Sequence, residues 1–362
     1  MVSPDAMTGP GGVVLEDAEN LDHFRKWAAA GTCNGNHLWM QINHPGRQVY
    51  EAMGEQALAP SAIALNIPGF SKLFAQPIAM SEEQIQDLIQ RFATTAALAE
   101  QAGFTGVQIH AAHGYLLSQF LSPLVNQRND QWGGSLENRS RIIFKVIDAV
   151  RAKVSKDFCV SIKLNSADFQ KGGFAAKDAK WLVEQLNNYH LDLVELSGGS
   201  YESPAMSGNA SEPSSGDSTA RREAYFVDFA RDISAVAAMP IMVTGGITKR
   251  AVAEQALDVS DDKQELGIAI DMVGIARAMA YQPDLAKQWK RGQNLEIQLP
   301  MASWKNKTLG ALATMAITKA QLSRMAAGKA PKPKMWPWLA LIVGQIKTKL
   351  RTKRYRAWRE SN

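Results

Sequence analysis

The sequence predicts an α/β fold of the TIM (β/α)8-barrel type, in which parallel strands alternate with helices. Short apolar runs alternate along the chain with longer amphipathic segments, which is the pattern of βαβ units. Polar side chains follow several different apolar runs directly, and the site of a TIM barrel is built from the loops after its strands. No Gly-x-Gly-x-x-Gly motif opens a helical segment, which argues against a Rossmann fold.

The apolar runs define the expected strands, and the amphipathic segments between them define the expected helices. This order places each helix as the crossover between two parallel strands. Strands are expected at His37–Asn43, Gly106–His110, Cys159–Leu164, Leu191–Leu196, Pro240–Thr244 and Met272–Ile275. Helices are expected at Glu82–Ala102, Glu137–Val154, Ala176–Asn188, Phe226–Ala238 and Lys249–Leu257.

The composition is that of an ordinary globular protein with a large core. The chain has 362 residues, of which 46% are hydrophobic and 21% are charged. Cys33 and Cys159 are far apart and fit no metal or redox spacing, so we expect two free thiols in a reducing compartment, which favours the cytoplasm. The amino terminus has no signal-peptide pattern, and no apolar stretch reaches the roughly 20 residues that span a bilayer.

The positive charge is concentrated in the carboxy-terminal tail. From Lys329 to Asn362 the chain has ten Lys or Arg residues and one acidic residue, a net +9, whereas the remainder has 30 basic and 34 acidic residues, a net −4. Apolar residues between Trp336 and Leu350 recur at roughly helical spacing. Such a helix can lie peripherally on an anionic membrane through residues 336–359, or it can dock on its own protein, which is more common. Nucleic-acid binding is not expected, because no recognised binding fold accompanies the charge.

The most informative motif is His110-x-x-His113-x-Tyr115, which follows an expected strand directly. Imidazoles donate hydrogen bonds near neutral pH, and a phenol can give a proton to a carbanion. A carbonyl oxygen held by two histidines, with an acid beside the neighbouring carbons, suits the reduction of an activated alkene. The alternative is a pair of metal ligands. It is disfavoured because no carboxylate or Cys partner lies nearby at a suitable spacing, so no metal site is expected.

The stretch from His110 to Arg139 resembles the Old Yellow Enzyme family of NADH:flavin oxidoreductases, or ene-reductases. The resemblance rests on that histidine motif together with Leu121-Ser-Pro123, Asn126-x-Arg128-x-Asp130 and Gly133-Gly-Ser-Leu-Glu-Asn-Arg139, and it extends from Met1 to about Pro283. It implies FMN as the cofactor and NADH or NADPH as the hydride donor. It also implies that His110 and His113 bind the substrate oxygen and that Tyr115 is the catalytic proton donor.

The resemblance also implies a set of cofactor-binding residues. Gln41 matches the glutamine whose amide meets the polar edge of the flavin pyrimidine. Lys163 matches the cation beside N1 and O2 of the isoalloxazine, although an ion pair with Glu195 is the structural alternative. Ser197 and Gly198 follow the expected strand Leu191–Leu196, where small residues let the backbone approach a ligand. The polar loop that follows, Ser200 to Ala224, is either a lid or a surface excursion.

The loops after the last two expected strands match a phosphate site. TIM barrels often bind a phosphate there through backbone amides and a helix start. Gly245 and Gly246 follow one strand, and Ala276 and Arg277 follow the other. Arg277 would add a charge-assisted contact to the FMN phosphate, and Ala276 stands where the family usually has glycine.

Family members have two strands before the first one expected here, and Met1-Val-Ser resembles the end of their second strand. The expectation is therefore a barrel truncated at its amino terminus to about six strands, which binds FMN more weakly than a complete barrel does. We divide the chain into an incomplete FMN-binding barrel, 1–300, and a helical extension with a basic amphipathic tail, 301–362.

Two other functions remain open from the sequence. The first is a catalytically impaired barrel remnant that acts as a binding or membrane-associated protein. The second is a different TIM-barrel enzyme, such as an aldolase or a phosphate-binding isomerase, which is disfavoured because only Lys163 could form a Schiff base. The natural substrate, the choice between NADH and NADPH, and the oligomeric state are not determined by the sequence.

Overall fold

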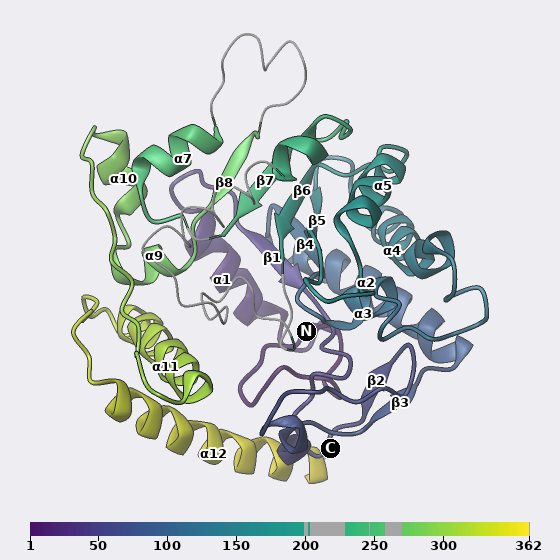
Figure 1. The fold of residues 1–362 in the computed structure, drawn as a ribbon, viewed down its shortest axis with the longest axis horizontal. Helices are drawn as coiled ribbons and strands as arrows, with labels where there is room; N and C mark the ends of the chain where they lie inside the picture. The colour runs from purple at the N-terminus through teal and green to yellow at the C-terminus, as the bar shows by residue number, and fades with distance from the viewer. Residues whose placement is uncertain (199–201, 203–228, 246, 258–269, 362) are drawn as a thin grey trace.

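The computed structural model describes residues 1–198, 202, 229–245, 247–257 and 270–361. Its centre is a sheet of parallel strands that neighbour one another in chain order (Figure 1). Within the described residues the sheet consists of β1 (Trp39–Ile42), β4 (Gly106–Ala111), β5 (Cys159–Asn165), β6 (Leu193–Ser197), β7 (Ile241–Thr244) and β8 (Met272–Gly274). Every strand expected from the apolar runs is present, and the expected and observed boundaries differ only at the ends. The chain start lies against the sheet, because the Val2 amide donates to the carbonyl of Asn43 just after β1, at 3.1 Å.

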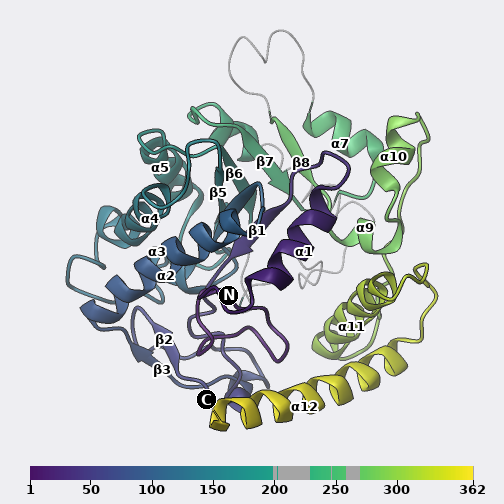
Figure 2. The same cartoon turned by 180° about the vertical axis from the view of Figure 1, so that it is seen from behind.

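Helices α2 (Glu82–Gln101), α4 (Leu136–Arg151) and α5 (Ala176–Leu186) cover the outer face of this sheet (Figure 2). Each matches an expected helix, as does α7 (Arg250–Ala256). Helix α2 begins with a capping box in which Ser81 and Gln84 satisfy each other's backbone amides. Of the expected helix Phe226–Ala238, residues 229–234 are helical, and 226–228 lie outside the described residues.

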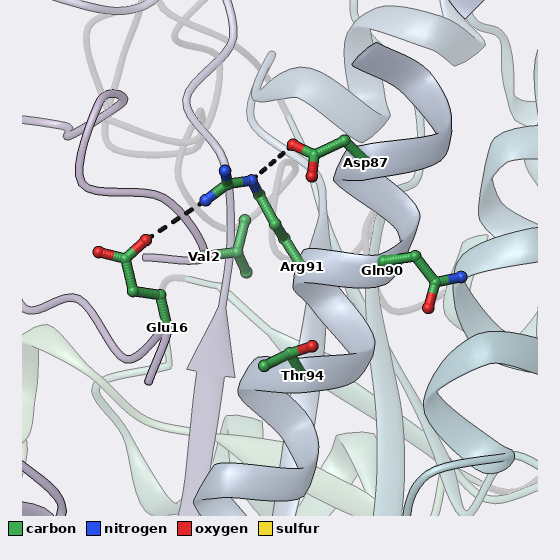
Figure 3. Close-up of a pocket in the computed structure, with 6 residues that line it drawn as sticks. All are labelled: Val2, Glu16, Asp87, Gln90, Arg91 and Thr94. Atoms are coloured by element: carbon green, nitrogen blue, oxygen red, sulfur yellow. Dashed lines mark hydrogen bonds and ion pairs between the residues drawn. The ribbon is translucent and has the colours of Figure 1, made fainter. Parts of the chain in front are cut away.

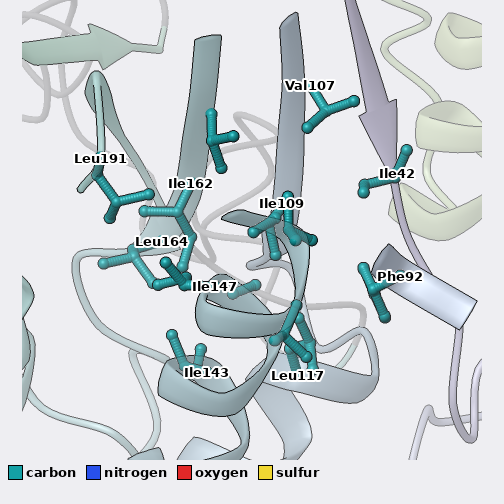
Figure 4. Close-up of a cluster of buried hydrophobic side chains, with 14 of the residues drawn as sticks. Ile42, Phe92, Val107, Ile109, Leu117, Ile143, Ile147, Ile162, Leu164 and Leu191 are labelled. Atoms are coloured by element: carbon teal, nitrogen blue, oxygen red, sulfur yellow. The ribbon is translucent and has the colours of Figure 1, made fainter. Parts of the chain in front are cut away.

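The core lies between the sheet and these helices (Figure 4). Side chains alternate between the two faces of a strand, so every second residue of β4 and β5 faces outward. The outward residues pack on α2 and α4, and all of them are at most 1% exposed: Val107, Ile109, Ile162 and Leu164 from the strands, and Phe92, Ile143 and Ile147 from the helices. The alternate residues, among them Gln108, His110 and Lys163, therefore face the opposite side of the sheet.

Several elements were not expected from the sequence. Helix α1 (Leu21–Thr32) buries only Leu21, Phe24 and Ala28, which is a weak apolar pattern. The others are short or lie beyond the last strand. They are η1 (Glu51–Met53), β2 (Ala57–Ala59), η2 (Ser71–Leu73), β3 (Pro77–Ala79), α3 (Leu116–Leu121), α9 (Arg277–Tyr281), α10 (Leu285–Lys290) and α11 (Lys307–Ala326). Strands β2 and β3 pair in parallel as a separate small sheet.

The basic tail forms one long helix, α12 (Pro337–Ser361), which runs along the edge of the molecule (Figures 1 and 2). One face of it docks on the protein, which was the more common of the two arrangements predicted for such a helix. The buried Tyr355 donates its hydroxyl proton to the carbonyl of Pro4 at 2.8 Å, and Arg359 donates to the carbonyl of Gly54 at 2.5 Å. None of the described helices is long and apolar enough to cross a membrane.

Candidate functional site

A chain of polar side chains crosses the inner face of the sheet. The register sets His110, Lys163 and Glu195 side by side on β4, β5 and β6. The Lys163 ammonium lies 2.7 Å from Glu195 Oε1, and the Gln108 amide donates to Glu195 Oε2 at 2.7 Å. The Gln41 amide in turn donates to Gln108 Oε1 at 2.7 Å. The two side chains implied for the flavin pyrimidine, Gln41 and Lys163, are thus joined through Gln108 and Glu195.

Lys163 and Glu195 therefore form an ion pair, which was the structural alternative to a flavin contact for Lys163. Burial alone would raise the pKa of Glu195, but the adjacent ammonium and the hydrogen bonds from Lys163 and Gln108 lower this pKa below its ordinary value. The carboxylate is consequently charged at neutral pH and partly neutralises the cation that would face a flavin.

This pairing predicts that Glu195→Gln raises the reduction potential of bound flavin. Without the carboxylate, the full charge of Lys163 stabilises the anionic reduced flavin. We expect an increase of about 30 mV, a tenfold change in the equilibrium of a two-electron couple. Spectroelectrochemical titration of the two FMN-bound proteins measures it. Asp178→Asn, on the outer helix α5, is the control, and an unchanged potential in Glu195→Gln would contradict the role of the ion pair.

The two histidines are adjacent and form one hydrogen-bonded relay. Nδ1 of His110 accepts from the amide of Ala112 at 3.2 Å, so the proton of this ring is on Nε2. That Nε2 lies 3.3 Å from Nδ1 of His113, and Nε2 of His113 lies 2.8 Å from Ser197 Oγ. Neutral rings protonated at Nε2 satisfy all of these contacts. In this arrangement Ser197, implied as a cofactor ligand, contacts His113.

Burial keeps both imidazoles neutral. Burial, reinforced by the neighbouring His113 and by the charge of Lys163, lowers the pKa of His110 well below 6.5. Burial and Lys163 lower the pKa of His113 to about 4. Both residues therefore stay neutral at physiological pH, and each carries one N–H. This state is suited to hydrogen bonding with an oxygen atom and unsuited to supplying a proton.

The same shifts predict acid sensitivity. The folded-state pKa of His113 lies below its unfolded value, so its contribution to stability is complete above about pH 6.5 and is lost as pH falls toward 4. Burial lowers the pKa of His44 to about 3, with the same sign. For His113 alone, the free energy of unfolding should fall by on the order of 2 kcal/mol between pH 7 and pH 4.5.

Urea unfolding of the FMN-free protein at both pH values measures this loss. His113→Asn removes the titrating group, so its unfolding free energy should decrease less with acid than that of the wild type. Equal decreases in the two proteins would show that His113 is not responsible.

A strained turn positions Tyr115. His113 and Gly114 have φ angles of 59° and 71°, in the left-handed region that a non-glycine residue occupies only when its surroundings hold it there. Asn165 Oδ1 accepts from the His113 amide at 2.9 Å, and the Gln48 amide donates to the carbonyls of His113 and Gly114, each at 2.9 Å. Tyr115 then begins α3 with its ring centroid 4.8 Å from that of His110. The turn brings the three residues of the motif together.

Sequence reasoning missed Asn165, Gln48 and Gln108. Strand alternation was a usable signal for two of them, because Gln108 precedes His110 by two residues and Asn165 follows Lys163 by two. Gln48 lies in a loop, where no periodicity indicates which way a side chain points.

The loops after β7 and β8 form the other end of the site. Thr244 and Gly274 are register partners, and a Cβ on Gly274 would lie 1.8 Å from Thr244 Oγ1, so only glycine fits there. Thr244 Oγ1 is buried and faces the Glu195 carboxylate, whose pKa it helps to lower. Gly245 follows it, and Ala276 and the half-buried Arg277 begin α9. Gly246 lies outside the described residues. A glycine position that a Cβ would fill, followed by an arginine at a helix start, fits the phosphate end of FMN, and Gln41 with Lys163 fits the ring end.

The flavin contact implied for Gly198 and the lid role considered for the loop after it are not observed in the described part of the structure. A Cβ on Gly198 would meet the ring of Phe169 at 2.7 Å, so the close approach observed there is made by a side chain. The loop Ser200 to Ala224 lies outside the described residues except for Glu202, whose carboxylate pairs with the buried Arg47. A flavin contact for Gly198 and a lid role for the loop stay predictions.

The motif between Asn126 and Arg139 ties loops and helices together behind the site. The side chains of Asn126, Arg128 and Arg139 all donate to backbone carbonyls. Their interactions join the segments around β2, β3, α3 and α4. The acceptors are Phe120 and Trp132 for Asn126, Pro60 and Met80 for Arg128, and Leu121 and Gly134 for Arg139.

A cavity of about 230 Å³ lies elsewhere, between the amino-terminal segment and α2 (Figure 3). Arg91 occupies one side of it, 2.6 Å from Asp87 and 3.3 Å from Glu16. Its remaining lining is Val2, Gln90 and Thr94, and it contains none of the residues of the histidine site.

Comparison with known proteins assigns this chain to a family. Residues 1–296 match the model of the NADH:flavin oxidoreductase / NADH oxidase family. The chain belongs to this family. The resemblance carried by the motifs is thereby confirmed, and with it FMN as the family's cofactor and a nicotinamide as its hydride donor.

Two relatives illustrate the match. The NADH-dependent flavin oxidoreductase nadA of Aspergillus parasiticus is 36% identical over 280 residues, which cover 77% of this chain and 60% of the relative. The NADPH dehydrogenase of Bacillus subtilis is 33% identical over 287 residues, which cover 78% of this chain and 75% of the relative. The chain thus spans about 60% of the length of the Aspergillus enzyme.

Solved structures support the barrel-type fold. A 2-naphthoyl-CoA reductase in complex with 2-naphthoyl-CoA is 27% identical with a TM-score of 0.66, over 80% of this chain and 43% of that one. The old yellow enzyme homologue of Zymomonas mobilis is 23% identical with a TM-score of 0.65, over 82% and 78% respectively. The fold class expected from the alternation of strands and helices is confirmed.

Proposed function

We propose that this chain binds FMN and uses NADH or NADPH to reduce activated alkenes, such as α,β-unsaturated carbonyl compounds. One observation carries the proposal: two neutral imidazoles and a phenol meet on the inner face of the sheet. The ring centroids of His110 and His113 are 5.0 Å apart, and that of Tyr115 is 4.8 Å from His110. This grouping supplies two donors for one oxygen and an acid for a neighbouring carbon.

The residues divide the work as follows. His110 and His113 would turn their Nε2–H groups from their present partners, His113 and Ser197, to the carbonyl oxygen. These hydrogen bonds would draw electron density from the conjugated alkene. Tyr115 gives its phenolic proton to the α-carbon. FMN, when bound, supplies the chemistry that relays a hydride from the nicotinamide to the β-carbon. Gln41 and Lys163 would hold the pyrimidine edge of the ring, while Gly245 and Arg277 would hold the phosphate.

Two half-reactions test this proposal. The purified protein is reconstituted with FMN, mixed anaerobically with NADH or NADPH while flavin absorbance is followed, and then mixed with 2-cyclohexenone. We expect bleaching in the first step and recovery of the oxidised spectrum in the second. A folded protein that retains no FMN would favour the barrel remnant without catalysis, and reduction by nicotinamide without reoxidation by enones would exclude activated alkenes as the substrate class.

A further inference from the structure

Helix α12 has two faces of different character. On the inner face Ala340 and Tyr355 are buried, and Gly344 lies against Ala316 of α11. The outer face carries large apolar side chains at spacings of three and four residues, which keeps them on one side of a helix. They are between 40% and 58% exposed: Leu339, Ile342, Val343, Ile346 and Leu350. We call these five residues the outer stripe.

The outer stripe lies along the rim of the molecule. In both views α12 is the outermost element on its side, and α11 lies on its inner side (Figures 1 and 2). The inner face is held by Tyr355 and Arg359, which bond to the amino-terminal segment and to the loop at Gly54. The stripe is therefore exposed while the helix itself is anchored.

Cations flank and continue the stripe. Helical spacing places them on either side of the apolar residues and along the last turns of the outer face. They are exposed, and no ion pair within the described part of the chain involves them: Lys347, Lys349, Lys353, Arg354 and Arg356. Two exposed tryptophans, Trp336 and Trp338, stand at the other end of the stripe. The whole tail has a net charge of +9.

We propose that the outer face of α12 binds the surface of an anionic lipid bilayer, with the helix parallel to it. The stripe would enter the boundary between headgroups and acyl chains, the cations would meet lipid phosphates, and the tryptophans would lie at headgroup depth. Because the inner face stays docked, the barrel is held at the membrane without unfolding of α12.

Charge and apolar surface together favour lipid over other partners. A second copy would bring two strongly basic faces together, and their repulsion opposes association. A nucleic acid would meet the cations but would leave the stripe in water. An anionic bilayer satisfies both, and each cation near its surface strengthens binding about fivefold at physiological salt.

Vesicle co-sedimentation of the full FMN-reconstituted chain tests the proposal. Vesicles of phosphatidylcholine alone are compared with vesicles of equal parts phosphatidylcholine and phosphatidylglycerol. We expect binding to the anionic vesicles only, weakened by salt. Ile342→Ser/Ile346→Ser should weaken it at least tenfold through loss of apolar insertion, and Lys353→Gln/Arg354→Gln should weaken it about 25-fold. Leu73→Ser, an equally exposed apolar position on η2, is the matched control and should bind as the wild type does.

The stripe residues are exposed, so the urea unfolding midpoints of all three variants should equal that of the wild type. A lowered midpoint would show that a loss of vesicle binding comes from misfolding. Failure of the folded wild type to bind anionic vesicles overturns the proposal. So does retention of full binding by Ile342→Ser/Ile346→Ser, because charge alone would then explain it. Two other results would assign the face to another partner and also overturn the proposal. One is a concentration-dependent dimer that this variant abolishes, and the other is DNA binding, in each case without vesicle binding.

Discussion

Replacing Tyr115 with phenylalanine is expected to slow enone reduction by about 100-fold or more while NADH still reduces the bound flavin at a nearly unchanged rate. In the proposed function the phenol is needed only to protonate the α-carbon, a step that would follow departure of the nicotinamide. The ring itself stays at the start of α3 against His110, so the packing of this ring pair is kept. Stopped-flow absorbance, with each half-reaction recorded separately, distinguishes the two effects.

Tyr50→Phe is the matched control. Tyr50 is also partly buried and stacks on Phe74 with ring centroids 5.0 Å apart, but it belongs to another part of the molecule. We expect both half-reactions of this variant to match the wild type. Equal slowing of both half-reactions in Tyr115→Phe would remove Tyr115 from the role of proton donor and indicate a role in flavin or nicotinamide binding.

Gly133→Ala is expected to destabilise the fold by about 3 kcal/mol, the upper end of the usual cost of overpacking. A Cβ at this position would lie 2.3 Å from the backbone oxygen of Arg128 and 2.7 Å from its carbonyl carbon. Backbone atoms cannot move aside as the end of a side chain can. Arg128 is also held in place, because its guanidinium donates to the carbonyls of Pro60 and Met80. The urea unfolding midpoint measures the loss.

Gly134→Ala is the informative comparison. Gly134 has a φ of 82° and nothing within 4 Å of an added Cβ, so the only cost is that of a left-handed alanine, about 1 kcal/mol. The neighbouring glycines of one motif should therefore differ, with Gly133→Ala the more damaging. The reverse order would mean that the motif requires glycine for backbone conformation and not for close packing.

The sequence determined the order of the elements and the chemistry of the histidine motif. The strands of the sheet carry apolar residues on the face that packs on the helices, and burial of that face selects such residues whatever the neighbours are. The helices α2, α4 and α5 carry apolar periodicity because each of them buries one face against the sheet. His110, His113 and Tyr115 come from one short segment, so their proximity follows from local chain geometry.

Tertiary structure decided what depends on contacts between distant segments. Gln48 and Asn165 support the turn at His113 from other loops and strands, and no local pattern indicates such a partnership. Whether Lys163 would pair with Glu195 depended on the register of β5 against β6. The tail sequence predicted a basic amphipathic helix, but several angular arrangements of its apolar residues could have faced the protein. The hydroxyl of Tyr355 and the guanidinium of Arg359 selected one of them, and their hydrogen bonds to Pro4 and Gly54 turned the outer stripe toward solvent.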